Sequence, residues 1–409
     1  MHNVTPACAD RPHHDVTPPG FPSLQTLLLA FGLALAAAAG LSSPVLAADA
    51  NGVHVARDGK LLRGNKPIRA IGVNYYDCFV RTLEAPSTNS TQNTSYEAGF
   101  AILERYRIPF ARISVTGFWP SEMALYKSDP NAYLRRLDGV MRSAEKHGIG
   151  IVPSLFWNLS TVPDIVGEPC NQWGNTNSQT HAFMRKYIRD IVGRYKDSPA
   201  IWGWEFGNEF NLAKDLPNAS TQHPPVVPSL GTPATRSTAD ELTHDMVSIA
   251  LAEFAREVRK LDPARFITSG NAIPRPSAWH MRKELSWTKD SPEEFNEILV
   301  AEHPAPIDVL SVHTYAEDIA RIVPCAEAAR KAHKPLFVGE FGVPGARTPE
   351  HERQFQDLLD TLRRERVPLS ALWVFDFAWQ GKDYSVTPDN ERGWQLEAIQ
   401  KANEALQAE

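Results

Sequence analysis

Two glutamates at the ends of apolar runs could act together on one bond. Glu209 ends the run IWGWEFGNE (201–209), and Glu340 lies in PLFVGEF (335–341), 340 − 209 = 131 residues further on. Cleavage of a glycosidic bond needs such a pair, because one carboxyl group protonates the leaving oxygen while the other attacks the sugar or activates water. Either glutamate alone is equally well explained as a solvated strand end, so the fold must bring the two together.

The pattern around the two glutamates predicts alternating strands and helices. Eight apolar runs are typical of strands, at 68–76, 109–115, 150–157, 201–209, 265–271, 308–315, 335–341 and 369–377. Between them, apolar residues three and four positions apart predict helices, for example at 96–108, 131–148, 181–196, 241–261 and 351–367. Eight such units predict a (β/α)8 TIM barrel, preceded by a short β-hairpin at about 52–67. An open doubly wound sheet would favour a Gly-rich phosphate loop after an early strand, and the sequence has none.

Connection lengths indicate which face of the barrel carries the site. Connections from a helix to the next strand are short, whereas those from a strand to the next helix are long, at about 76–95, 210–238, 271–291 and 377–392. Long loops are usually functional, and barrel enzymes carry their sites at the carboxyl ends of the strands. Glu209 and Glu340 end the fourth and seventh strands, so both are expected in one barrel mouth.

Alternation along the fourth strand separates a structural glutamate from a catalytic one. The odd-numbered residues from 201 to 209 share a face, so Glu205 is expected inside the barrel beneath Glu209. A buried carboxylate needs a partner, and Arg112 from the second strand is the available cation. We therefore predict a buried Arg112–Glu205 pair. Trp204, on the opposite face, is expected to pack outward against helices.

The order of these motifs resembles clan A of the glycoside hydrolases, and most closely family 5, the cellulase and β-mannanase family. The resemblance covers essentially all of the chain after the apolar leader, through IGVNYYD, Arg112, WEFGNE, HTY, GEFG and ALWVFDF. It implies a retaining mechanism with Glu209 as acid/base and Glu340 as nucleophile. The two carboxyl groups are then expected about 5–5.5 Å apart, with Glu340 ionised and Glu209 held protonated by the adjacent negative charge.

The resemblance also implies supporting residues. Asn208 matches the residue that holds the sugar 2-hydroxyl, and Tyr315 matches the one that hydrogen-bonds the nucleophile. Arg112 and His313 match supporting positions, and Trp373 matches the floor of the subsite before the scissile bond.

The third strand departs from the family pattern and leaves the subfamily open. It ends Phe156-Trp157-Asn158, where many members carry a histidine. Trp157 and Trp379 are predicted to stack on sugar rings, because indoles offer a large contact area at little entropic cost. His303, which precedes the sixth strand, is expected to be a surface or capping residue.

Composition and motif content argue against nucleic-acid partners, metal sites and a disulfide framework. The chain of 409 residues has 42 Lys+Arg against 48 Asp+Glu, a formal charge of −6, so it lacks the basic footprint of a nucleic-acid binder. The sequence has no HExxH, EF-hand loop or paired Cys/His spacing, so no metal or cofactor is expected. Beyond Cys8 in the leader, the cysteines Cys78, Cys170 and Cys325 allow one disulfide but no disulfide framework.

The amino-terminal region differs from the rest of the chain in its long, uncharged apolar segment. Residues 24–47 carry no charge and end Val45-Leu46-Ala47, which predicts a signal peptide cleaved after Ala47. Residues 1–47 are therefore interpreted as leader and signal, and 48–409 as one catalytic domain that is secreted or periplasmic, with no stable membrane insertion. A membrane anchor is the alternative, but the apolar part is barely long enough to span a bilayer and no basic cluster follows it.

The resulting hypothesis is a retaining endo-type β-glycoside hydrolase. Its expected substrate is a β-1,4-linked polysaccharide such as mannan or glucan, or its oligosaccharides, and it is expected to act as a monomer without a cofactor. An exo-acting β-glycosidase and a non-catalytic carbohydrate-binding barrel are the alternatives, although a binder has no reason to keep both glutamates. A metal-dependent hydrolase is a third option, disfavoured because the sequence shows no ligand cluster. Glucan or mannan, and endo or exo action, stay open because they depend on loop shape.

Overall fold

The computed structural model describes residues 52–83 and 93–409. The predicted signal segment, including Ala47 and Cys8, lies outside these residues. The described chain begins with a three-stranded antiparallel sheet of β1 (Val53–Val55), β2 (Leu61–Arg63) and β3 (Lys66–Pro67). The expected hairpin is therefore present, with one further short strand. No described helix combines the length and the apolar character needed to cross a bilayer.

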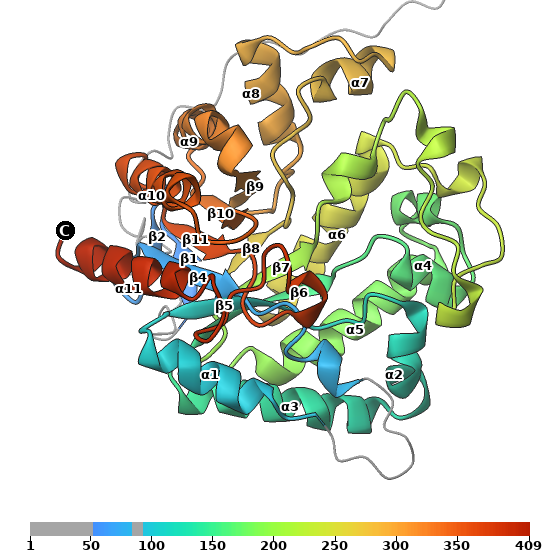
Figure 1. The fold of residues 1–409 in the computed structure, drawn as a ribbon. Helices are drawn as coiled ribbons and strands as arrows, with labels where there is room; N and C mark the ends of the chain where they lie inside the picture. The colour runs from blue at the N-terminus through green and yellow to red at the C-terminus, as the bar shows by residue number, and fades with distance from the viewer. Residues whose placement is uncertain (1–51, 84–92) are drawn as a thin grey trace, which may run out of the picture. The chain divides into compact units, whose positions relative to one another are not determined.

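Eight parallel strands of the described chain form the barrel (Figure 1). They are β4 (Ala70–Asn74), β5 (Phe110–Ser114), β6 (Gly150–Phe156), β7 (Gly203–Gly207), β8 (Phe266–Thr268), β9 (Leu310–Tyr315), β10 (Leu336–Gly342) and β11 (Leu369–Leu372). They are ordered β8-β7-β6-β5-β4-β11-β10-β9. A parallel bridge between Thr268 and Val309 joins the two end strands. The predicted (β/α)8 barrel is confirmed.

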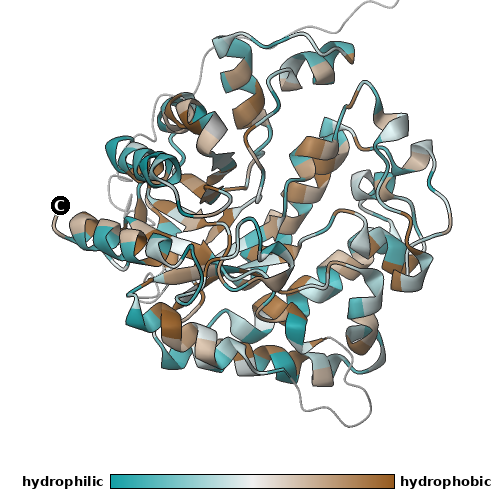
Figure 2. Cartoon of the chain, in the orientation of Figure 1, coloured by the Kyte–Doolittle hydropathy of each residue, from teal (hydrophilic) through white to brown (hydrophobic). Residues whose placement is uncertain are grey.

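Helices surround the strands, and Figure 2 shows hydrophobic colour on the strands and on the helix faces turned toward them. The helices are α1 (Tyr96–Arg105), α2 (Ala124–Ser128), α3 (Pro130–Lys146), α4 (Thr161–Val166), α5 (Gln179–Tyr195), α6 (His244–Leu261), α7 (Ala278–Glu284), α8 (Pro292–Ala301), α9 (Ile322–Lys331), α10 (Pro349–Arg364) and α11 (Trp394–Gln407). Several start after a side chain that accepts a hydrogen bond from the first turn, as at Asp129, Ser178, Thr243, Ser291 and Thr348. The five helices expected from periodicity are all present, with ends shifted by a few residues.

Short 3-10 turns, labelled η, occupy many of the connections. They are η1 (Val80–Thr82), η2 (Pro120–Met123), η3 (Cys170–Gly174), η4 (Phe210–Ala213), η5 (Ala219–Thr221), η6 (Pro228–Leu230), η7 (Thr238–Asp240), η8 (Ala316–Arg321) and η9 (Ala378–Gln380). The long connection after β7 contains four of them, η4 to η7, and the one after β8 contains α7. The long connections after β7 and β8 therefore contain regular structure that follows the carboxyl ends of these strands.

Two apolar clusters frame the barrel. A smaller cluster includes Phe110, Trp202 and Phe337 from the lower parts of the strands, together with Val53 of the hairpin. The larger cluster, between the strands and the helices, includes Ile201 and Trp204. Trp204 is thus outward as expected, and its indole N–H donates to Asp262. Ile201 was predicted to share the inward face of Glu205, and this is wrong. Trp202 packs in the inner cluster instead, and Ile201 belongs to the outer one.

His303 is a capping residue, one of the two roles expected for it, and not a surface residue. It is 1% exposed, and its ring bonds a carbonyl in the last turn of α8. Its Nε2 accepts from the backbone N–H of Ser311 at 2.9 Å, so Nδ1 carries the proton and donates to the Leu299 carbonyl at 2.8 Å. Burial lowers the pKa of His303 to about 4, so the ring is neutral at physiological pH. The side chain therefore links α8, through the Leu299 carbonyl, to β9, through the Ser311 N–H.

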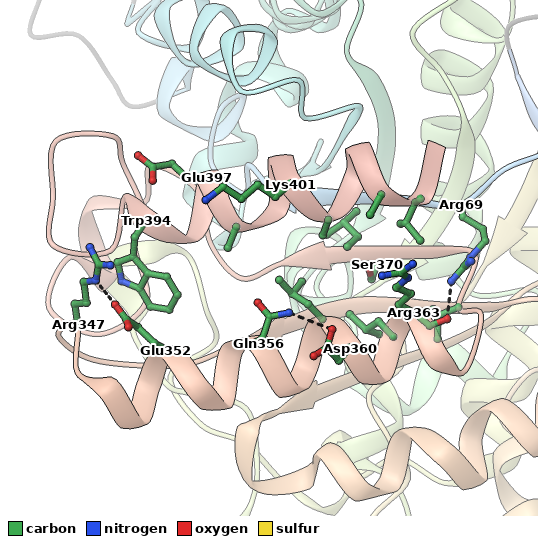
Figure 3. Close-up of a pocket in the computed structure, with 18 residues that line it drawn as sticks. Arg69, Arg347, Glu352, Gln356, Asp360, Arg363, Ser370, Trp394, Glu397 and Lys401 are labelled. Carbon is green, nitrogen blue, oxygen red and sulfur yellow. Dashed lines mark hydrogen bonds and ion pairs between the residues drawn. The ribbon is translucent and has the colours of Figure 1, made fainter. Parts of the chain in front are cut away.

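A cavity of about 450 Å³ lies between α10 and α11 on the outside of the barrel (Figure 3). Charged side chains such as Glu352 and Lys401 line it together with Trp394 and Ile71. It contains none of the residues predicted for the site. The hollow belongs to the packing of two neighbouring helices, and the candidate chemistry lies elsewhere.

Candidate active site

Arg112 on β5 is the centre of a polar network inside the barrel. The side chain is fully buried, and its Nε donates to Glu205 Oε1 at 2.7 Å. Its Nη1 donates to Asn74 Oδ1 at 2.9 Å and to Glu340 Oε1 at 2.8 Å, and its Nη2 donates to Asn208 Oδ1 at 2.8 Å. The predicted Arg112–Glu205 pair is confirmed. One guanidinium also orients three further side chains, which come from β4, β10 and the end of β7.

Replacing Glu205 tests the structural side of this network. Glu205→Gln should lower the free energy of unfolding by about 3–5 kcal/mol, because it leaves a buried guanidinium short of one counter-charge. Urea unfolding of purified protein measures the loss, with Glu297→Gln on the exposed face of α8 as a control expected to stay within about 0.5 kcal/mol. A Glu205→Gln protein with ordinary stability and activity would contradict the assignment.

Glu209 and Glu340 come together at the carboxyl ends of the strands. Glu340, 4% exposed, accepts a hydrogen bond from the Tyr315 hydroxyl at 2.7 Å in addition to the one from Arg112. Glu209 has a side chain that is 32% exposed, and its Oε1 lies 2.9 Å from His313 Nδ1. That same nitrogen lies 3.5 Å from Glu340 Oε1. The two glutamates offer oxygen atoms within 4.8 Å of one another.

The two carboxyl groups lie in different electrostatic surroundings. Burial raises the pKa of Glu209, and the positive charges of Arg112 and Arg275 oppose the shift. Burial is thus the main cause, rather than the adjacent negative charge expected from the sequence. Glu340 accepts from an arginine and from Tyr315, whose own pKa is raised by burial and by the Glu340 charge, so that its hydroxyl stays a donor. Glu340 is therefore oriented by two hydrogen bonds that it accepts, from Arg112 and from Tyr315. Burial favours the protonated form of Glu209.

His313 on β9 is a neutral link between the two glutamates. Burial lowers its pKa to about 3, with Arg112 adding to the shift and Glu340 opposing it. The imidazole is therefore uncharged at neutral pH and can share one proton with Glu209 through Nδ1.

The backbone places Glu209 by a strained turn at the end of β7. Glu209 has φ +55°, in the left-handed region, and its N–H donates to the Gly270 carbonyl at 2.9 Å. Gly270 itself has φ +74°, and a Cβ there would lie 1.9 Å from the Gly207 carbonyl oxygen. Only glycine therefore allows the ends of β7 and β8 to approach this closely. Strained non-glycine residues cluster at functional sites, where the surroundings hold them.

Aromatic side chains cover one side of the network. Trp373, just after β11, stacks on Trp157 with ring centroids 6.0 Å apart, and Tyr76 packs against both rings. The Arg112 guanidinium lies 4.4 Å from the centre of a Trp157 ring, and Trp157 is only 5% exposed. These contacts give Trp157 a packing role beside the sugar contact predicted for it, which stays a prediction. Trp379, by contrast, is 88% exposed.

Sequence reasoning missed two residues of the site. Asn74 accepts from Arg112 and donates through Nδ2 to the Gly339 carbonyl at 2.9 Å. Its signal was present in the sequence, as a polar residue near the carboxyl end of the apolar run 68–76. Gln380 accepts from the indole N–H of Trp373 at 2.7 Å and so orients that ring. Gln380 ends the short turn η9 in the connection after β11, and no sequence pattern marks it.

The site also contains a group of potential metal ligands, Glu209, His313 and Glu340. Arg112 Nη1 lies 2.8 Å from Glu340 Oε1, so a fixed positive charge already occupies one side of this group and would repel a cation. Within the described chain the cysteines Cys78, Cys170 and Cys325 are buried and free. The disulfide left open by the sequence is not formed.

Comparisons with known proteins agree with this architecture. Residues 70–377 match the family model described as Cellulase (glycosyl hydrolase family 5). The chain is 40% identical over 82 residues to mannan endo-1,4-beta-mannosidase F of Aspergillus clavatus, covering 19% of each protein. It is 36% identical over 86 residues to mannan endo-1,4-beta-mannosidase A of Podospora anserina, covering 20% of this chain and 22% of the relative. The match thus spans about a fifth of the length of these curated relatives.

Solved structures show the same fold. The endo-1,4-beta-mannanase of Rhizomucor miehei superposes with a TM-score of 0.63 at 15% identity, covering 88% of this chain and 100% of that one. The endo-beta-1,4-mannanase of Thermotoga petrophila gives a TM-score of 0.59 at 14% identity, covering 83% of this chain and 78% of that one. At this identity the likeness concerns the fold.

Proposed function

Because the chain belongs to glycosyl hydrolase family 5, the cellulase family, we propose that it is a retaining, endo-acting β-glycoside hydrolase. Glu209 is the acid/base and Glu340 the nucleophile. The observation that carries this proposal is the separation of at most 4.8 Å between an oxygen of each carboxyl group. Retaining enzymes hold the two carboxyl groups about 5–5.5 Å apart, whereas inverting enzymes keep about 6.5–9.5 Å for a water molecule.

The proposed reaction has two steps. Glu340 attacks the anomeric carbon while Glu209 gives its proton to the oxygen of the leaving sugar, so the glycosidic bond breaks and a glycosyl ester forms on Glu340. Glu209, now ionised, takes a proton from a water molecule whose oxygen attacks the same carbon and releases Glu340. Burial of Glu209 supports the first step, because it raises the pKa of this carboxyl group and so favours the protonated form that an acid needs. Arg112 and Tyr315 keep Glu340 aimed as an acceptor.

Neighbouring side chains supply the sugar-binding contacts of the proposal. Asn208 uses its Oδ1 on Arg112, which leaves its amide N–H groups free to donate to the sugar 2-hydroxyl. Trp373 forms the floor of the subsite before the scissile bond, held by Gln380. The exposed ring of Trp379 is available to stack on a more distant sugar unit.

For the substrate we propose a β-1,4-linked mannan, with β-1,4-glucan as the second candidate. The curated relatives named mannan endo-1,4-beta-mannosidase favour mannan, and the family description favours glucan. Reducing-sugar release from linear mannan, glucomannan and carboxymethyl cellulose tests the choice, and a rapid fall in viscosity distinguishes endo from exo action. Proton NMR of the first product should show retention at the anomeric carbon. Binding of these polymers without any hydrolysis would support the non-catalytic alternative.

We further propose that the protein is exported after cleavage behind Ala47 and acts as a monomer. The uncharged apolar segment 24–47 with its small-residue end supports export. Amino-terminal sequencing of secreted protein tests the cleavage position, and light scattering tests the oligomeric state.

A further inference from the structure

The turn that carries Glu209 is pinned by a buried amide two residues later. Asn211, in η4, is 4% exposed. Its Nδ2 donates to the Ala272 carbonyl at 2.9 Å, and its Oδ1 accepts from the Ala272 N–H at 3.0 Å. With the bond from the Glu209 N–H to the Gly270 carbonyl, the turn is joined at two points to the segment after β8. The position of the Glu209 backbone is therefore set by that segment.

A buried ion pair between Lys214 and Glu302 contacts the Asn211 side chain. Asn211 Nδ2 also donates to Glu302 Oε2 at 2.8 Å, and Lys214 Nζ lies 3.0 Å from Glu302 Oε1. Both charged residues are almost fully buried, at 2% exposure for Glu302 and 3% for Lys214. Lys214 also donates to His244 Nδ1 at 2.9 Å, and burial lowers the pKa of His244 to about 3, so this ring is a neutral acceptor. Buried charges cost desolvation energy, and a fixed orientation of their partners is one benefit they bring.

The strained conformation of Glu209 needs such support. A left-handed non-glycine residue persists only where its surroundings hold it. Leu212 closes the turn by donating its N–H to the Glu209 carbonyl at 2.9 Å, and its own carbonyl accepts from Arg275 at 3.0 Å. Without the Asn211 link, the turn would lose its attachment to Ala272 and to the ion pair.

We propose that Asn211, held by the Lys214–Glu302 pair, positions the Glu209 carboxyl group for proton transfer to the leaving oxygen. The inference rests on the proposed function of Glu209. Asn211 is a positioning residue, because it acts through the Glu209 turn and not on substrate.

The charged and titratable groups that face Glu209 come from other elements. They are Arg112 on β5, Arg275 after β8, His313 and Tyr315 on β9, and Glu340 on β10. None of them bonds to the Asn211 side chain. A change in the pH profile of an Asn211 variant therefore reports a change in the placement of Glu209.

The test compares two substrates that differ in their need for an acid. In Asn211→Ala, kcat/KM on polysaccharide should fall about tenfold or more, because misplacement of a catalytic group by about 1 Å can cost about 10²-fold. On an aryl glycoside with a 2,4-dinitrophenolate leaving group, which needs no proton, kcat/KM should change by less than about threefold. The basic limb of the polysaccharide profile should move to lower pH, because a less buried Glu209 is more acidic.

Asn403 on α11 offers a matched control. It is also 4% exposed, and it pairs with Ile71 in the same two-point manner, at 2.8 Å for each bond, near the amino end of β4. Asn403→Ala should lower the melting temperature much as Asn211→Ala does and leave the ratio of the two kcat/KM values unchanged. Equal ratios in the two variants would overturn the proposal.

Two other results need their own interpretation: an Asn211→Ala protein that does not fold, and a wild-type protein without activity. If Asn211→Ala does not fold, Glu302→Gln keeps the volume and an acceptor for Asn211 while removing the charge opposite Lys214. It should shift the substrate ratio in the same direction, and an unchanged ratio would overturn the proposal. If the wild-type enzyme hydrolyses neither substrate, the proposed function of Glu209 fails, and with it the basis of the positioning role.

Discussion

Replacing Glu340 by glycine should abolish hydrolysis of polysaccharide, with kcat reduced on the order of 10⁵-fold, or about 7 kcal/mol of transition-state stabilisation. The physical reason is that no other carboxylate of the network can reach the sugar. Glu205 lies beneath the site, fully buried, and its Oε1 is bound to Arg112 Nε. Loss of Glu340 removes the group that forms the glycosyl ester, while Arg112 keeps Glu205 as its counter-charge.

Azide should restore part of the activity of the Glu340→Gly protein on an activated aryl glycoside. The small anion can occupy the space that the side chain leaves, where Arg112 and Tyr315 lost their acceptor. It then attacks the anomeric carbon directly, so the product is a glycosyl azide of inverted configuration, which proton NMR identifies. Circular dichroism of the variant checks that the fold is kept. Near-normal activity on polysaccharide, or inversion by the wild-type enzyme, would contradict the assignment of Glu340 as nucleophile.

Replacing Glu209 by alanine should lower kcat/KM on polysaccharide by about 10²–10⁴-fold, the usual contribution of a general acid. An aryl glycoside with a good leaving group should keep most of its kcat/KM, because its bond breaks without a proton. Steady-state kinetics on the two substrates measures the contrast. If both substrates lost activity to the same extent, Glu209 would not be the acid.

The pH profile gives a second readout of the same substitution. Burial raises the pKa of Glu209, so the wild-type protein should be active while the pH is below that raised pKa and should lose activity as the pH rises through it. The basic limb of kcat/KM should therefore lie above the usual range of a glutamate, and it should disappear in Glu209→Ala. A basic limb that persists unchanged in the variant would belong to another group.

The architecture and the meeting of Glu209 with Glu340 in one site could be predicted because they depend on local, periodic features of the chain. Eight apolar runs separated by helical periodicity determined a barrel, and the position of each glutamate at a strand end determined its face. Alternation with period two identified Glu205 as an inward residue, and charge compensation then selected Arg112. These inferences need only the direction of a side chain from its strand and the cost of burying a charge.

Other features were decided by the closed barrel. Arg112 reaches Glu340 across 228 positions of sequence, and the same guanidinium bonds Asn74, whose part in the site depends on the register between β4 and β5. The burial of Trp157 and His303 depends on which aromatic rings and helices pack over them. The strained turn of Glu209 is bonded to Gly270 and Ala272 from the segment after β8. Such contacts join residues that are remote in the chain, so no local pattern encodes them: the sequence alone determined which side chains face the barrel mouth, and only the tertiary structure decided which of them touch.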